Sequence, residues 1–312
     1  MNIKGALRDF YDLTRLPLGI MAGIMGLTAG MIVVLVQRKA PGEHAILAVF
    51  RLLPEYWELA VLGLTVPFLI VGASMAINDF YDFSSDRINQ RMDRPLVRNP
   101  SLNPQYVLFL ALSMIAIGII ISFFLFVDNL LVTIGVAIFS FLSISYNLWT
   151  KEMGIIGNMT VAASDTAPAI LALIALRGTD PSTVLLVLSM SGITFFGVVG
   201  RELVKGVMDI EGDRITRSNT FAVRFGPIRA VQLASVFFVI LAIIAPVPLF
   251  VKFYNNLLYV ILMGITLGLF FYSITILYKD PSVENGKKAR SYTRLALWTG
   301  ALSFLAGALF LP

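Results

Sequence analysis

The sequence predicts an all-α polytopic membrane protein with nine transmembrane helices. It is 57% hydrophobic and 14% charged, whereas an average soluble domain is about 25% charged. The apolar residues come in runs of about twenty, which is long enough to cross a hydrocarbon core of about 30 Å. Runs of this length must be helices, because a bilayer leaves no backbone group unpaired. Since no polar stretch could form a soluble domain, residues 1–312 are interpreted as one membrane-embedded domain.

The predicted spans follow one another with short polar connections. They cover residues 17–36, 58–78, 106–126, 130–148, 158–176, 183–203, 230–251, 256–278 and 292–311. The first span contains Gly19, Gly23, Gly26 and Gly30, a G-x-x-x-G spacing that predicts close helix contact. The stretch 37–57 is too charged and interrupted to span, so we expect an amphipathic helix at the outer interface.

The distribution of lysine and arginine predicts the orientation. With a cytoplasmic N-terminus, the inner segments hold 18 of the 24 basic residues and the outer segments hold 5, as the positive-inside rule requires. The C-terminus is then outside. Both acid-rich cap loops, 79–104 and 204–229, fall on the cytoplasmic side.

Several classes of site are excluded by composition. The chain has no cysteine, which removes disulfides, thiolate metal sites and cysteine nucleophiles. The single histidine, His44, lies in a loop-like stretch and is interpreted as a solvated side chain. The basic residues are spread over several short loops, so nucleic acid is not an expected partner.

The first acid cluster follows the second span directly, in the stretch "INDFYDFSSDR". If the helix continues, Asn78, Asp82 and Asp86 lie at i, i+4 and i+8 on one face. Like charges at that spacing repel each other unless a cation lies between them. Oxygen ligands without histidine or cysteine suit Mg²⁺.

The second cluster, "RELVKGVMDIEGDR", places Asp209 and Asp213 at i and i+4, with Glu202 and Glu211 nearby. Two acid sites on one membrane face could hold a diphosphate through two Mg²⁺ ions. Basic side chains that could bind its phosphate oxygens are Arg87, Arg94, Lys151, Arg201, Lys205 and Arg214. The alternative is a solvated, salt-bridged loop.

Asp165 lies inside the predicted span 158–176. An ionisable residue at that depth suggests a function, here binding an acceptor head group or taking its proton. The alternative is an interhelical hydrogen bond to a serine, threonine or tyrosine.

Four motifs resemble those of the UbiA-type intramembrane prenyltransferases. "NDFYDFSSDRINQRMDRPL" is similar to the family's first aspartate-rich signature, and "VMDIEGDR…NTFAVRFG" to its second. "YNLWTK" resembles the Tyr-then-Lys element after the fourth span, and "GIIGNMTVA" the Gly-Asn element that opens the fifth. Their order and spacing match over nearly the whole chain.

The resemblance implies nine helices around a central cavity, under a cytoplasmic cap of loops and short helices. It also implies Mg²⁺-dependent transfer of an isoprenoid chain from a prenyl diphosphate to a lipid or aromatic acceptor, with no obligatory protein partner. On the family pattern one Mg²⁺ is held by Asn78, Asp82 and Asp86, and the other by Asp209 and Asp213. Asp79 would lie behind these ligands. Lys151 and the loop arginines would neutralise the leaving diphosphate, and Tyr146 would lie near the allylic carbon.

One position departs from the family pattern. Many archaeal-type members carry a further aspartate three residues before the second motif, where this chain has Gly206. The second metal is therefore left with Asp209 and Asp213, with Glu202 or Glu211 as possible support.

The acceptor stays open at this point. The stretch "REL-x-K…DIEGD" is most similar to archaeal enzymes that add a second geranylgeranyl chain to geranylgeranylglyceryl phosphate, and aromatic prenyltransferases of quinone pathways share much of it. Outside the family, an ion-coupled secondary transporter would place its acids near the midplane. An alcohol phosphotransferase would need a D-x-x-D-G-x-x-A-R pattern, which "DFYDFSSDR" lacks.

Overall fold

The computed structural model describes residues 3–88, 90–215, 219–253 and 256–311. Within these ranges the chain is helical and contains no strand. The elements are α1 (Ile3–Thr14), α2 (Leu16–Arg38), α3 (Ala45–Leu52), α4 (Trp57–Ala60), the π-helix η1 (Val61–Thr65), α5 (Val66–Tyr81), α6 (Phe83–Ile88), α7 (Pro95–Arg98), α8 (Pro104–Leu125), α9 (Leu130–Leu148), the 3₁₀-helix η2 (Thr150–Glu152), α10 (Ile155–Ala175), α11 (Pro181–Ile215), α12 (Phe221–Phe225), α13 (Pro227–Ile244), α14 (Val247–Val251), α15 (Leu257–Lys279) and α16 (Val283–Leu309).

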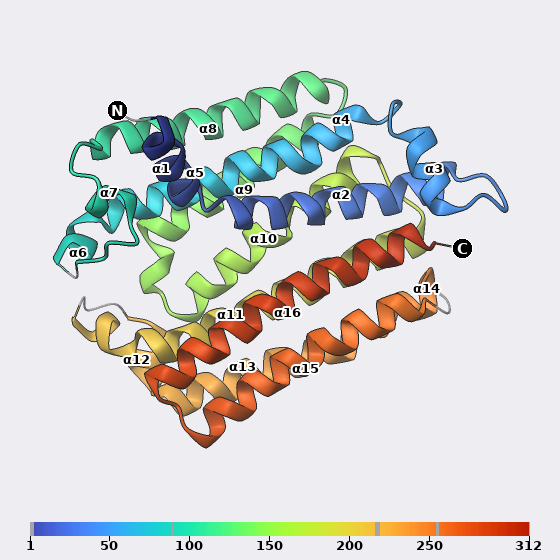
Figure 1. Cartoon of the computed structure of the whole chain (residues 1–312). Helices are drawn as coiled ribbons and strands as arrows, with labels where there is room; N and C mark the ends of the chain where they lie inside the picture. The colour runs from blue at the N-terminus through green and yellow to red at the C-terminus, as the bar shows by residue number, and fades with distance from the viewer. Residues whose placement is uncertain (1–2, 89, 216–218, 254–255, 312) are drawn as a thin grey trace.

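The long helices run side by side in two groups (Figure 1). The first group contains α2, α5, α8, α9 and α10, and the second contains α11, α13, α15 and α16. The groups meet where α10 packs on α11 and where α2 packs on α16. The short helices α6, α7 and α12 lie together at one end of the bundle, and α3 and α14 lie at the other.

Eight helices in the described part of the chain are long and apolar enough to cross a membrane. The expected count of nine is not confirmed. The ninth predicted span, 292–311, falls within α16, whose first turns carry Glu284, Lys287, Lys288 and Arg290, followed by Arg294. These charged residues lower the mean hydropathy of α16, which is not among the eight helices. The helix nevertheless packs along α15 and α11.

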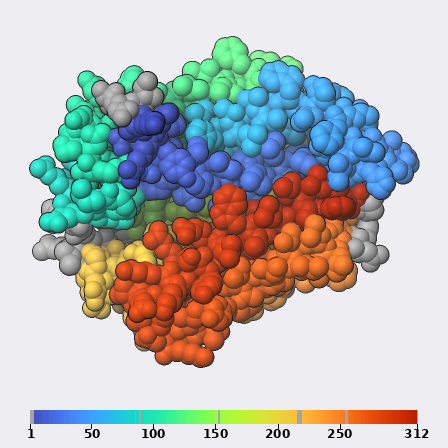
Figure 2. All heavy atoms as spheres, in the orientation of Figure 1, coloured from blue at the N-terminus to red at the C-terminus, as the bar shows by residue number. Residues whose placement is uncertain are grey.

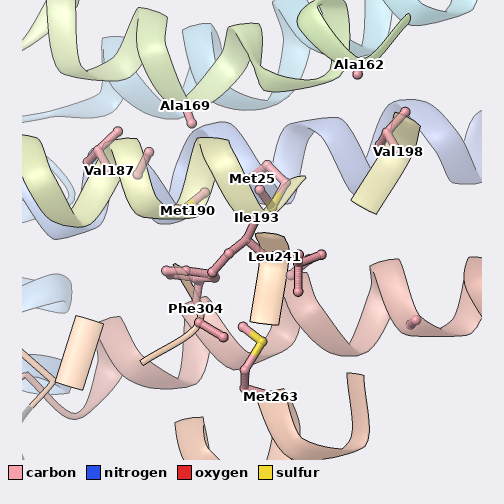
Figure 3. Close-up of a cluster of buried hydrophobic side chains, with 14 of the residues drawn as sticks. Met25, Ala162, Ala169, Val187, Met190, Ile193, Val198, Leu241, Met263 and Phe304 are labelled. Carbon is pink, nitrogen blue, oxygen red and sulfur yellow. The ribbon is translucent and has the colours of Figure 1, made fainter. Parts of the chain in front are cut away.

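Close packing between α2 and the start of the second span follows from glycine, as the G-x-x-x-G spacing predicts. A Cβ added at Gly26 would lie 3.0 Å from the Gly63 carbonyl oxygen, and one added at Gly30 would lie 2.5 Å from Leu59 Cδ2. Any larger side chain would push the two helices apart. The main hydrophobic core lies where α11 packs against α2, α10, α13, α15 and α16, with Met25, Met190, Ile193, Leu241 and Phe304 among its side chains (Figure 3).

Three regions differ from the sequence-based expectation. The segment 204–229 was expected as a loop, but α11 continues as a helix through the second acid motif. The N-terminal helix α1 was not predicted. In the stretch 37–57, where we expected an amphipathic helix, α3 is a helix but covers only Ala45–Leu52, and residues 37–38 complete α2. Leu47 and Phe50 of α3 are exposed.

Candidate active site

A cavity of about 1080 Å³ lies between the two groups of helices. Residues of α2, α5, α9, α10, α11 and α16 line it, together with residues around α6 and α12. Figure 2 shows the middle of the chain (green) recessed between the blue N-terminal helices and the red α16. Many of the charged lining residues belong to the segments around α6 and α12 and to the end of α11, and the lining also includes Asp165 and apolar residues such as Met25, Ile193 and Phe304.

The first acid cluster lies on a helix that continues almost without a break. The Asp82 amide donates to the Asn78 carbonyl at 2.9 Å, and the Asp86 amide donates to the Asp82 carbonyl at 2.8 Å. These i+4 bonds put Asn78, Asp82 and Asp86 on one face, as predicted, and all three line the cavity. The Asn78 side-chain Nδ2 donates to Asp82 at 2.8 Å, so the side-chain oxygen Oδ1 of Asn78 is available as an acceptor or ligand.

Asp82 is neutralised from a distant part of the chain. Lys151, on η2, donates to both of its carboxylate oxygens, at 2.6 and 2.9 Å. The short α9–α10 connection thus carries a cation to the end of α5.

Asp86 is buried beside two arginines that come from the following loop. Its carboxylate lies 3.5 Å from Arg91 Nη1 and 3.6 Å from Arg94 Nε. Burial raises the pKa of Asp86 to about 6, although Arg91 opposes that shift. An additional cation beside this carboxyl group would favour its charged form.

Asp79 points away from the cavity and holds two arginines. It accepts from Arg15 Nη2 at 2.7 Å and from Arg94 Nη1 at 3.2 Å, and its side chain is only 1% exposed. Arg15 has a φ of +45°, a left-handed conformation that is uncommon for a side-chain-bearing residue. The turn it makes between α1 and α2 brings its guanidinium to Asp79, so Asp79 supports the site from behind.

The second acid motif lies along one face of α11. Glu202 accepts from Arg201 at 2.6 Å and from Lys205 at 3.1 Å. Asp213 accepts from the Thr220 hydroxyl at 3.0 Å. Asp209 and Asp213 line the cavity, as does Gly206, and Glu211 is exposed at the rim.

The residues present fit magnesium. Among the described residues no three acidic or histidine side chains are gathered closely enough to form a protein-only metal site. Mg²⁺ is bound in proteins by one or two carboxylates, with waters and substrate phosphates as the other ligands. Two oxygen-donor sets, Asn78 with Asp82 and Asp86, and Asp209 with Asp213, meet that requirement once a diphosphate is present.

The structure brings most of the predicted site residues to the cavity, and leaves two outside it. Those that line it are Asn78, Asp82, Asp86, Arg94, Tyr146, Lys151, Asp165, Arg201, Lys205, Asp209 and Asp213. Arg87 and Arg214 are exposed and do not line it.

Four arginines that sequence reasoning did not assign line the same cavity: Arg15, Arg91, Arg290 and Arg294. Arg294 could have been identified from the sequence, because it falls inside the predicted span 292–311, where an ionisable residue suggests a function. The other three lie outside the predicted spans, where no pattern separates them from ordinary loop arginines.

Comparison with known proteins agrees with this site. Residues 45–300 match the model of the UbiA prenyltransferase family. The chain is 30% identical over 309 residues to the digeranylgeranylglyceryl phosphate synthase of Archaeoglobus fulgidus, covering 98% of this chain and 97% of that one. It is 28% identical over 309 residues to the enzyme of the same name from Pyrococcus furiosus, covering 99% of both.

Two solved structures share the fold. One, described as digeranylgeranylglyceryl phosphate synthase in membranes, has a TM-score of 0.71 at 22% identity and covers 98% of this chain and 99% of that one. The other is a UbiA homologue from Archaeoglobus fulgidus bound to DMAPP and Mg²⁺, with a TM-score of 0.63 at 15% identity, covering 95% and 99%.

Proposed function

The chain belongs to the UbiA prenyltransferase family, and from that premise we propose that it transfers a geranylgeranyl chain from its diphosphate to geranylgeranylglyceryl phosphate in a Mg²⁺-dependent reaction. The protein is a multi-pass membrane prenyltransferase. One observation carries the proposal: two acid groups from α5–α6 and α11 line a single cavity that also has an apolar wall, with Met25, Ile193 and Phe304 among its residues. The identity of the acceptor is inferred from the relatives, which are named digeranylgeranylglyceryl phosphate synthase.

The polar end of the cavity suits a diphosphate leaving group. Bound Mg²⁺ would be held by the two oxygen-donor sets and would supply charge neutralisation at the diphosphate. Lys151, Arg91 and Arg94 lie at the same end and can donate to phosphate oxygens. Fixed cations at this point stabilise the negative charge that develops as the allylic C–O bond breaks.

The transfer breaks the bond from the allylic carbon to the diphosphate and forms an ether bond to the acceptor hydroxyl oxygen. Tyr146 lines the same cavity as the two acid groups, and its ring is our candidate for facing the developing allylic cation. The acceptor hydroxyl must lose its proton. Asp165, on α10 and facing the same cavity, is our candidate base for that proton.

The cytoplasmic placement of the polar end is part of the proposal and rests on the 18 to 5 distribution of basic residues. It opens the site to water-soluble Mg²⁺ and to diphosphate release.

The test is transfer by the purified protein, with labelled geranylgeranyl diphosphate, Mg²⁺ and separate acceptors, followed by product mass. We expect digeranylgeranylglyceryl phosphate from geranylgeranylglyceryl phosphate, and no product with EDTA. A prenylated product from an aromatic acceptor alone would assign the chain to the quinone-type branch. Undiminished transfer in a metal-free assay would contradict the proposed chemistry.

A further inference from the structure

A second basic group lies on the wall of the cavity formed by α11 and α16. Arg290 and Arg294 are one turn apart on α16, and both are exposed to the cavity. Arg290 is within electrostatic range of Arg201, Asp209, Glu202 and Arg294. The structure thus gathers basic side chains from two helices that are separated by some 90 positions in the chain.

This basic group is separate from the cations of the first acid cluster. Lys151, Arg91 and Arg94 belong to the α5–α10 side of the cavity, and they contact Asp82, Asp86 or Asp79. Arg290 and Arg294 come from α16, in the other group of helices (Figure 1). No ion pair to either of these two arginines is found within the described ranges.

The donor diphosphate does not need the second group. The charges of the donor site balance without it. Two Mg²⁺ ions and the cations Lys151, Arg91 and Arg94 carry the positive charge. A trivalent diphosphate and the four site aspartates, Asp82, Asp86, Asp209 and Asp213, carry an equal negative charge, the exposed rim carboxylates Asp93 and Glu211 aside. Further cations are therefore available for another anion.

The second group carries surplus positive charge. Asp209, which also faces Arg290 and Lys205, is already counted with the donor site. The other carboxylates near Arg201, Lys205, Arg290 and Arg294 are Glu202 and Asp165, which leaves two positive charges uncompensated. Arg201 uses Nη1 for Glu202, and its Nε has no hydrogen-bond partner within the described ranges. A phosphate monoester carries close to two negative charges near neutral pH, so it matches this surplus.

The wall beyond the arginines suits a lipid chain. Leu297, Ala301 and Phe304 continue the cavity-lining face of α16, at helical spacings from Arg294 that keep them on one side. A ligand with a phosphate head and an apolar tail would meet guanidinium groups first and hydrocarbon side chains farther along α16.

We propose that Arg201, Arg290 and Arg294 form the binding site for the phosphate head group of the acceptor lipid, separate from the diphosphate site of the donor. The assignment rests on the proposed prenyl transfer and adds the feature that selects a phosphorylated acceptor over a neutral or aromatic one. Arg201 and Asp165 are in electrostatic range of each other, so an acceptor held here has its hydroxyl-bearing end near the candidate base.

The test measures acceptor binding and turnover separately. The variants are Arg290→Gln and Arg294→Gln, and Lys287→Gln is the matched control, because Lys287 is an exposed cation on α16 outside the cavity lining. Equilibrium binding is measured with labelled geranylgeranylglyceryl phosphate and with its dephosphorylated alcohol. KM is measured for each substrate.

We expect each arginine variant to weaken binding of the phosphorylated lipid by about tenfold or more, as for loss of a hydrogen bond between charged groups. Binding of the alcohol and the KM for geranylgeranyl diphosphate should stay unchanged, and so should all values for Lys287→Gln. An equal rise in the donor KM would show that the arginines serve the diphosphate and would overturn the inference. Equal affinity of the wild-type protein for the lipid phosphate and the alcohol would overturn it too.

Inorganic phosphate as a competitor separates a head-group site from a site for free phosphate. Displacement of the lipid by an equal concentration of inorganic phosphate would contradict the lipid assignment. Arginine-dependent lipid binding without any product would retain this inference and refute the proposed transfer. Product formation that is insensitive to both arginine variants would support the proposed transfer and refute this inference.

Discussion

Lys151 Nζ lies 2.6 Å from Asp82 Oδ2, although the two residues are 69 positions apart in the chain. The contact joins the α9–α10 connection to the end of α5 and places a cation against the central carboxylate of the first acid motif. Lys151 is 36% exposed and Asp82 28%, so both remain accessible from the cavity. This pairing neutralises the Asp82 carboxylate, and it keeps Lys151 where a leaving phosphate would need it.

Asp82→Asn and Asp213→Asn should each lower prenyl transfer by roughly 100-fold or more, because asparagine keeps the shape and loses the charge that binds metal and stabilises the leaving group. Initial rates at saturating Mg²⁺ would measure this loss. Glu284→Gln, which removes an exposed carboxylate from α16, should leave the rate unchanged. Near wild-type turnover by both aspartate variants would show that the metal assignment is wrong.

Gly206→Asp should lower the Mg²⁺ concentration needed for half-maximal activity. Gly206 lines the cavity on a helix that continues to Ile215, at i−3 from Asp209. A Cβ there would meet only Ala222 Cβ, at 3.4 Å, so a side chain can be accommodated. The new carboxylate would supply a metal ligand that water would otherwise have to provide.

Gly206→Ala is the control for that experiment, since replacing a helical glycine by alanine favours the helix by about 1 kcal/mol. Equal shifts for aspartate and alanine would attribute the effect to the backbone. No shift with either would mean that position 206 does not reach the metal.

The Mg²⁺ requirement should rise as the pH falls through about 6, the value to which burial raises the pKa of Asp86. A carboxylate with a raised pKa is charged above that value and protonated below it, and metal binding needs the charged form. Titrating Mg²⁺ against activity at several pH values would measure the change. In Asp86→Asn the Mg²⁺ requirement should be higher and should lose this pH dependence; an unchanged profile would assign the titration to another group.

Single cysteines introduced at Asn103 and at Pro41 should react with a membrane-impermeant reagent from opposite sides of the membrane. The chain has no native cysteine, and both positions are exposed. Asn103 lies between α7 and α8 and Pro41 between α2 and α3, and α7 and α3 lie at opposite ends of the bundle (Figure 1). The distribution of lysine and arginine places Asn103 inside. Labelling of Asn103→Cys in intact cells would invert the orientation, and labelling of both from one side would contradict a bundle that spans the bilayer.

Much of the site could be predicted because it is local in the chain. Asn78, Asp82 and Asp86 share a face through helical periodicity alone, and Asp209 and Asp213 do the same on α11. The end of α11 was harder to predict, because a polar segment rich in glycine and charge reads as a loop. It stays helical because its apolar side residues Val207 and Ile210 belong to the core or pack against it.

The sequence by itself determined the membrane class, the helical architecture and the residue types of both acid motifs, since these depend on hydropathy and on spacings of a few residues. Only the tertiary structure decided which cations meet those acids: Lys151 at Asp82, Arg15 at Asp79, and Arg290 with Arg294 on the wall beside Arg201. It also excluded Arg87 and Arg214 from the cavity. The reason is physical. Helical periodicity fixes neighbours within a few turns, whereas pairing between helices depends on packing and rotation that the chain specifies only as a whole.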